Sequence, residues 1–265
     1  MHLLLIRHVE SVDNAASLYG GSRDAGLTAH GALQAQRLAS SLAESRLLVK
    51  HIFSSNLERA VKTAHAIRDA QNNAHQSALT VVELAELREK HFGNWEGVKF
   101  ASGSTQHKPV QTGAETLESL RARCNAFLEQ CLAPVMTAQT VEPDNNCVVV
   151  VGHGISLGVL TLALVKKLSN GSRYDSTRIS WSNTGYADLV ISMSSATAVD
   201  VPAASSSPWS KLGFRVAQIN CTAHLHGLRK TRGGIGSAAH DDKQKTIQGY
   251  FVASSRKRKA SDVTN

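Results

Sequence analysis

The sequence predicts an α/β protein: a three-layer αβα sandwich with a mostly parallel central sheet and a flexible C-terminal tail. Short apolar runs alternate with longer stretches of helical periodicity, which is typical of a parallel sheet layered between helices. The run at 147–151 is almost wholly apolar, as expected for a strand that is covered on both faces. Hydrophobic residues make up 42% of the chain, enough for a sizeable core.

The elements follow one another in a regular order. We expect strands over residues 2–6, 49–54, 80–82 and 147–151, and helices over 28–44, 57–70, 115–132 and 155–168. Thr28 is the expected N-cap of the first helix, and Leu33, Leu38 and Leu42 recur behind it at helical spacing.

The alternation of expected strands and helices ends late in the chain. Two further strands are expected over 187–192 and 214–219, joined by a Ser/Ala/Pro-rich linker at about 194–208. We therefore expect one domain over residues 1–221, followed by a basic tail over 222–265 that is largely disordered.

Composition narrows the class of protein. Most of the formal net charge of +8 lies after Cys221, so the globular part is near neutral. The four cysteines show no CxxC spacing, which favours reduced thiols in an intracellular protein. The N-terminal apolar run is too short for a signal peptide, and no stretch is long enough to span a bilayer. We expect no membrane association and a cytoplasmic or nuclear location.

Charged side chains follow three of the expected strands. Arg7 and His8 follow the first, Arg59 comes shortly after the second, and His153 follows the late apolar strand. Because the carboxyl ends of parallel strands share one edge of a sheet, these side chains can converge there. A guanidinium suits phosphate, and a histidine can act as a nucleophile.

Further polar residues lie near the same edge. A loop containing Asn14 and Gly21 separates the first strand from its capped helix, which makes a suitable cradle for an anion. Glu86 and Glu89 are both candidates for a proton donor, and the residues alone do not separate them. We expect Glu10 to act structurally, as a partner for nearby arginines.

In these motifs the chain resembles the histidine phosphatase superfamily, also called phosphoglycerate mutase-like. The family's Arg-His-Gly-Glu motif stands here as residues 7–10, with Asn14 shortly after it. Its Leu-Thr-x-x-Gly element, second arginine motif, acid motif and second histidine stand at 27–31, 54–63, 87–97 and 153. The resemblance spans roughly residues 1–220.

The resemblance implies a metal-independent phosphomonoester hydrolase without a cofactor, acting on a small phosphorylated substrate. It implies that His8 forms a phosphohistidine and that Glu89 is the general acid and base. Other implied contacts to the substrate are Arg7, Arg59, protonated His153, Asn14, Gly21 and Gly154.

Two departures bear on the function. Val9 replaces the usual glycine after the nucleophile, so we expect a small shift of the backbone there. Leu18 stands where many mutase relatives carry a basic residue, which argues against acidic sugar phosphates.

The modest segment 94–111 favours a phosphatase over a phosphomutase. A further alternative is a catalytically idle domain that serves as an interaction module.

The tail carries a second signal. Gln244, Ile247, Tyr250 and Phe251 have the spacing of a sliding-clamp-binding (PCNA-interacting) box, which predicts the replication clamp as a partner. The alternative is a terminal helix that packs on its own domain. The basic cluster at 256–259 predicts nuclear localisation or contact with nucleic acid.

Overall fold

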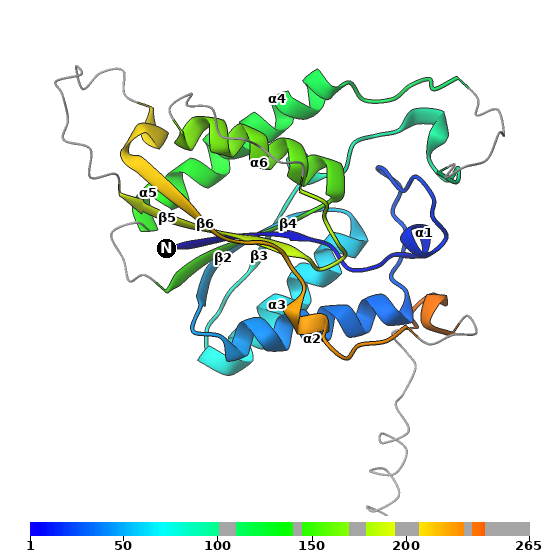
Figure 1. The fold of residues 1–265 in the computed structure, drawn as a ribbon, viewed down its shortest axis with the longest axis horizontal. Helices are drawn as coiled ribbons and strands as arrows, with labels where there is room; N and C mark the ends of the chain where they lie inside the picture. The colour runs from blue at the N-terminus through cyan, green and yellow to red at the C-terminus, as the bar shows by residue number, and fades with distance from the viewer. Residues whose placement is uncertain (101–109, 140–144, 170–178, 194–206, 231–234, 242–265) are drawn as a thin grey trace, which may run out of the picture.

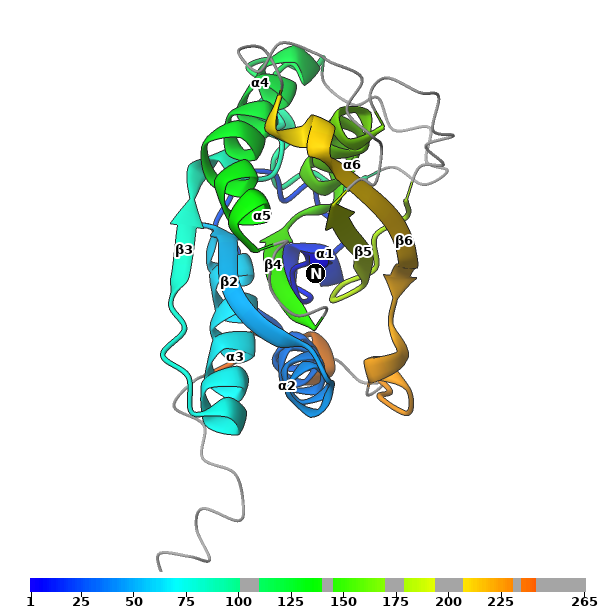
Figure 2. The same ribbon diagram turned by 90° about the vertical axis from the view of Figure 1, so that its left-hand side faces the viewer.

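A six-stranded sheet with the strand order β3-β2-β4-β1-β5-β6 forms the centre of the computed structural model (Figure 1). The structure describes residues 1–100, 110–139, 145–169, 179–193, 207–230 and 235–241. Helices α2 and α3 cover one face of the sheet, and α4, α5 and α6 cover the other (Figure 2). The predicted three-layer fold is confirmed.

The bounds of the elements agree closely with the expected ones. The strands are β1 His2–Arg7, β2 Leu48–Ser55, β3 Val81–Leu84, β4 Asn146–Gly152, β5 Tyr186–Met193 and β6 Leu212–Cys221. The helices are α1 Val12–Ala15, α2 Ala29–Glu44, α3 Glu58–His75, α4 Leu117–Phe127, α5 Ala133–Gln139 and α6 Gly154–Leu168.

The sheet is parallel where it carries the site. β1 pairs with β4, β4 with β2 and β2 with β3 in parallel, while β5 and β6 add two antiparallel pairings. Side chains of β1 alternate between the two faces of the sheet. Leu3 and Leu5 belong to the hydrophobic core between the sheet and helices α4 to α6. Leu4 and Ile6 belong to the hydrophobic core between the sheet and helices α2 and α3. Burial on both faces explains the unbroken apolar runs of the central strands.

Two helices differ from their expected bounds. α3 continues to His75, because the side chain of Gln71 is buried and bonds the Leu42 carbonyl at 3.0 Å. α4 passes through a π-helical turn at Leu128–Leu132 into α5. Pro134, which has no N–H to donate, is the second residue of α5, just after this turn.

Helix α2 shows which of its three leucines are buried. Thr28 caps α2 as expected, accepting a 2.9 Å hydrogen bond from the Gly31 N–H. Leu38 and Leu42 are buried, whereas Leu33 is 47% exposed. Leu33 thus lies outside the buried face of α2 to which Leu38 and Leu42 belong.

The residues after Cys221 that the structure describes contact the domain. We call the described residues 222–230 and 235–241 the C-terminal strap. Near the start of α2, the Ala29 N–H donates to the Ala238 carbonyl at 3.0 Å. The His240 N–H donates to the Leu27 carbonyl at 2.9 Å. The expected disorder thus does not extend to this part of the tail.

The strap also supplies the partner of Glu10. The Lys230 ammonium lies 2.9 Å from one Glu10 carboxylate oxygen, and the Thr28 hydroxyl donates to the other at 2.8 Å. The expected arginine partner was therefore wrong, because a lysine from the other end of the chain takes that place. His224 adds a 2.9 Å side-chain hydrogen bond to Thr184.

Residues 242–265 lie outside the described part of the chain, as do residues 194–206 of the expected linker. The clamp-binding box and the basic cluster therefore stay predictions. Within the described ranges, no helix has the length and apolar character needed to cross a membrane.

We expect removal of the strap to destabilise the domain. A variant ending at Cys221 loses the four strap contacts described above and should unfold about 8–16 °C lower than the full chain. Each hydrogen bond lost is worth about 1 kcal/mol, and 1 kcal/mol corresponds to about 2–4 °C in a domain of this size. Thermal unfolding followed by circular dichroism measures the change.

A variant ending at Asp241 is the matched control, because every strap contact described above lies before residue 242. It should unfold within about 2 °C of the full chain. Equal melting temperatures for the two truncations would show that the strap contributes nothing.

Candidate active site

Parallel pairing of β1 with β4 brings the two predicted histidines together. Arg7 lies opposite Gly152 in the register, so His8 and His153 each follow the end of one of two neighbouring strands. Their ring centroids are 4.8 Å apart. The convergence expected from the strand ends is therefore present in the structure.

The imidazole of His8 is held in one tautomer. Its Nδ1 lies 2.5 Å from the Val9 carbonyl oxygen, which can only accept, so Nδ1 carries the proton. Nε2 then has a lone pair, which accepts a 3.2 Å hydrogen bond from Arg59 Nε. Burial, Arg59 and Arg7 lower the pKa of His8 well below its usual value. His8 is thus a neutral base whose Nε2 is available as a nucleophile.

Two guanidinium groups flank this nitrogen. Arg7 Nη1 donates to the Trp181 carbonyl at 2.5 Å, while its buried Nε has no hydrogen-bond partner among the described residues. Arg59 donates to the carbonyls of Arg23 and Gly21 at 2.6 and 2.7 Å. Burial lowers the pKa of both arginines, but a guanidinium keeps its charge at neutral pH. The pair provides positive charge for an anion.

Gly21 is required for the contact to Arg59. Its φ of +53° is a left-handed conformation, and an added Cβ would overlap the Glu96 carboxylate and the Phe92 ring. This conformation turns the Gly21 carbonyl toward Arg59. The glycine therefore shapes the loop that orients the second arginine.

His153 lies behind His8 and is completely buried. Its Nε2 bonds the Ser55 hydroxyl at 2.8 Å, and its Nδ1 has no hydrogen-bond partner among the described residues. Burial, followed by the charges of Arg59 and Arg7, lowers the pKa of His153 well below its usual value. In the free protein this ring is therefore neutral, and the protonated form expected in contact with a substrate stays a prediction.

Glu89 lies at the N-terminus of α6. Its Oε1 accepts hydrogen bonds from the N–H groups of Lys90 and Ser156 at 2.8 and 3.0 Å. Its Oε2 accepts from the Ile155 N–H at 3.0 Å. The carboxylate therefore satisfies N–H groups in the first turn of the helix, where negative charge is stabilised.

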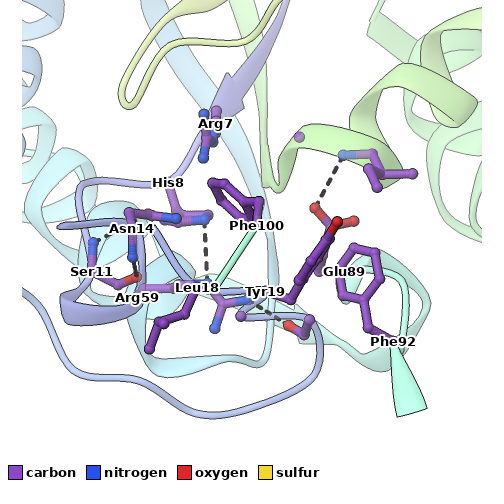
Figure 3. Close-up of a pocket in the computed structure, with 14 residues that line it drawn as sticks. Arg7, His8, Ser11, Asn14, Leu18, Tyr19, Arg59, Glu89, Phe92 and Phe100 are labelled. Carbon is purple, nitrogen blue, oxygen red and sulfur yellow. Dashed lines mark hydrogen bonds between the residues drawn. The ribbon is translucent and has the colours of Figure 1, made fainter. Parts of the chain in front are cut away.

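The structure separates the two candidate acids. Glu89 lines a cavity of about 240 Å³ together with Arg7, His8 and Arg59 (Figure 3). Glu86 does not line it. The other lining residues are Ser11, Asn14, Leu18, Tyr19, Gly20, Gly21, Phe92, Phe100, Gly154 and Ile155. The predicted Asn14, Gly21 and Gly154 are thus in place, while His153 lies behind the cavity.

Val9 shows no unusual backbone, since it is not among the non-glycine residues with positive φ. Its side chain is fully buried against Leu27 and Ala35, and its N–H donates to the Thr63 hydroxyl at 3.1 Å. A β-branched residue fits after the nucleophile because an apolar contact is available there.

Some supporting residues were not predicted. Ser55 and Thr63 lie in the second arginine motif, which was the only signal for them. Asn183 donates to the His8 carbonyl at 3.0 Å and to Asn14 Oδ1 at 3.2 Å from the segment before β5. No local pattern indicates Asn183, because its role depends on the pairing of β5 with β1.

A family model and known proteins match this chain. The model of the histidine phosphatase superfamily (branch 1) matches residues 3–196. A probable phosphatase of Schizosaccharomyces pombe is 30% identical over 249 residues, covering 92% of this chain and 77% of the relative. A 2,3-bisphosphoglycerate-dependent phosphoglycerate mutase of Mycobacterium leprae is 32% identical over 199 residues, covering 64% of this chain and 78% of that protein.

A solved structure shares the fold. A mycobacterial glucosyl-3-phosphoglycerate phosphatase, solved with VO3, superposes with a TM-score of 0.60 at 22% identity. The match covers 83% of this chain and 99% of that one.

The buried neutral histidines predict a pH-dependent stability. Since the pKa values of His8 and His153 lie below 6.5 in the folded chain, the unfolded chain binds more protons below that pH. Their contribution is fully present above about pH 6.5 and is lost as the pH falls. Each histidine should steepen the slope as the pH falls below 6.5, toward a limit of about 1.4 kcal/mol per pH unit.

Urea unfolding between pH 6.5 and 5.5 measures this slope. His8→Asn and His153→Gln do not titrate, so each should have a shallower slope than the wild type. Parallel lines for all three proteins would contradict the burial of neutral histidines.

Proposed function

The chain belongs to the histidine phosphatase superfamily, and from this premise we propose that it hydrolyses phosphomonoesters through a phosphohistidine on His8. The observation that carries the proposal is the state of His8. Its Nε2 has a lone pair, is bonded to one guanidinium, and shares a small cavity with a second guanidinium and a carboxylate.

The groups around His8 suit a phosphate dianion. The Arg7 Nε is a buried donor without a partner among the described residues, so an anion that it binds replaces no protein contact. The Leu57 N–H donates to the Ser55 oxygen, and in this proposal the Ser55 hydroxyl donates to His153 Nε2. His153 Nδ1 is then an N–H donor, and a neighbouring dianion would raise the pKa of His153.

The reaction proceeds in two displacements. In the first, the lone pair of His8 Nε2 forms the P–N bond while the ester P–O bond breaks. The electron pair leaves with the oxygen, which takes a proton from the acid form of Glu89. In the second, Glu89 takes a proton from water as the water oxygen attacks phosphorus. The P–N bond breaks, its electron pair returns to Nε2, and inorganic phosphate leaves.

Charge favours a hydrolase over a mutase. A mutase must retain a second phosphoryl group while the first one moves. Among the described residues that line the cavity, Arg7 and Arg59 are the only cations, and both flank His8. A second phosphate would be buried there without a counter-charge. Water is therefore the better supported acceptor.

Loss of the nucleophile provides the first test. The protein should hydrolyse p-nitrophenyl phosphate in the presence of EDTA, and His8→Ala should lower the rate at least about 10³-fold. Release of p-nitrophenolate measures the rate, and circular dichroism checks the fold. His75→Ala, at the far end of α3, is the matched control and should retain full activity. Equal, negligible rates for the wild type and His8→Ala would favour the idle interaction module instead.

The role of Glu89 predicts a separate kinetic signature. p-Nitrophenol leaves without a proton, so Glu89→Gln should still release it in a burst of about one equivalent. Steady turnover should then fall about 10²–10⁴-fold, because water has lost its base. An alkyl phosphate, whose alkoxide needs a proton, should give no burst. Stopped-flow measurements detect the burst and the steady rate. Turnover by Glu89→Gln at the wild-type rate would exclude Glu89 as the general acid and base.

A further inference from the structure

The cavity that holds the candidate nucleophile has two unlike halves. His8, Arg7, Arg59 and Glu89 form the polar floor. Around the opening lie five apolar or aromatic side chains, which we call the apolar collar: Leu18, Tyr19, Phe92, Phe100 and Ile155. In the view of Figure 3, Phe100 and Tyr19 lie between His8 and Glu89, and Phe92 lies beside Glu89.

Aromatic rings dominate the collar. The Tyr19 ring centroid lies 5.0 Å from that of Phe92 and 5.1 Å from that of Phe100. Phe100 is 46% exposed and Ile155 is 39% exposed. Large apolar side chains that stay partly exposed beside a cavity are ready to bury apolar surface of a ligand.

Backbone hydrogen bonds hold the collar in place. The segment 17–20, after β1, runs antiparallel to the segment 97–100, after β3, and Leu18 bridges Lys99. The Tyr19 N–H donates to the Val98 carbonyl at 2.9 Å. The Phe100 N–H donates to the Ser17 carbonyl at 3.0 Å. Two distant loops are thus locked together, so the rings are positioned before any ligand binds.

The collar offers no charge to a leaving group. Neither cation among the described lining residues belongs to it. The Lys90 ammonium lies 5.5 Å from the centroid of the Phe92 ring but does not line the cavity. An acidic leaving group would therefore lose its hydration against aromatic rings without gaining an ion pair.

The size of the cavity limits the leaving group. Its volume of about 240 Å³ is below the roughly 300–1,000 Å³ of sites for drug-sized ligands. A phosphoryl group bound at His8 leaves room for a small moiety between the rings. A single flat ring suits this space, because aromatic pairs gain from edge and offset contacts with ring centroids roughly 4.5–7 Å apart.

We propose that the apolar collar selects phosphomonoesters with an uncharged aromatic leaving group and discriminates against acidic ones. This inference rests on the proposed phosphatase activity. The polar floor binds any phosphoryl group, whereas Tyr19, Phe92 and Phe100 determine which alcohol is released.

Two matched substrate pairs test the proposal. Benzyl and ethyl phosphate both release a primary alcohol and differ in the ring. Phenyl and 4-carboxyphenyl phosphate share the ring and differ in one charge. We expect kcat/KM to be at least tenfold higher for benzyl than for ethyl phosphate, and at least tenfold higher for phenyl than for 4-carboxyphenyl phosphate. Phosphate release measures each value in the presence of EDTA.

Variants assign the preference to the collar. Phe100→Ala should lower the benzyl-to-ethyl ratio at least threefold, and a ratio is insensitive to partial loss of folded enzyme. Leu33→Ala removes an exposed apolar side chain of α2 and should leave both kcat/KM values unchanged.

The outcomes are distinct. Hydrolysis of all four esters with similar kcat/KM, or a preference for 4-carboxyphenyl phosphate, would overturn the collar proposal and leave the phosphatase proposal intact. A benzyl-to-ethyl ratio that Phe100→Ala does not change would overturn the role of the collar. No hydrolysis of any ester would overturn both proposals.

Discussion

The parallel pairing of β1 with β4 is the constraint on which the site depends. It sets Arg7 opposite Gly152, so the residues that follow both strands meet at one edge. The pairing is itself fixed by burial on both faces. Sliding β1 by one residue would exchange Leu3 and Leu5 with Leu4 and Ile6 between two separate cores. Packing of apolar side chains thus determines where the imidazoles lie.

The site concentrates positive charge away from water. Arg7 and Arg59 are both desolvated, and together with burial they keep two neighbouring imidazoles neutral. Carbonyl groups of Trp181, Arg23 and Gly21 hold the guanidinium groups in place. Donors that are oriented in advance need little reorganisation when charge develops on a bound group, and a low-dielectric surrounding strengthens their effect. Burial of the two guanidinium groups costs free energy while the site is empty. The same burial strengthens their attraction for an anionic ligand.

Much of this arrangement could be predicted, because the charged residues of the site come shortly after the ends of strands. Arg7, His8, Arg59 and His153 each come shortly after an apolar run, and parallel strands end at one edge. Glu86 and Glu89 both lie near the end of the same strand, so only the family motif, or the position of Glu89 in the cavity lining, distinguishes the two carboxylates.

Other features have no local signature. Asn183 reaches the His8 carbonyl only because a late strand pairs with the first one. The strap was expected to be disordered because its Gly, Ser and Lys residues lack an apolar pattern. Two of the contacts that anchor it use backbone groups, and every sequence has these. The neutral state of His153 depends on burial and neighbouring charges, which spacing along the chain does not show.

The strap also has a topological consequence. His240 is bonded to Leu27, so the last residues that the structure describes lie beside the start of α2. Any molecule that binds residues 242–265 is therefore tethered to the domain at this point. Its effective concentration near the domain is set by the length of the intervening chain rather than by its concentration in solution. Tethering alone can thus bring a partner of the tail close to the domain without a second binding surface.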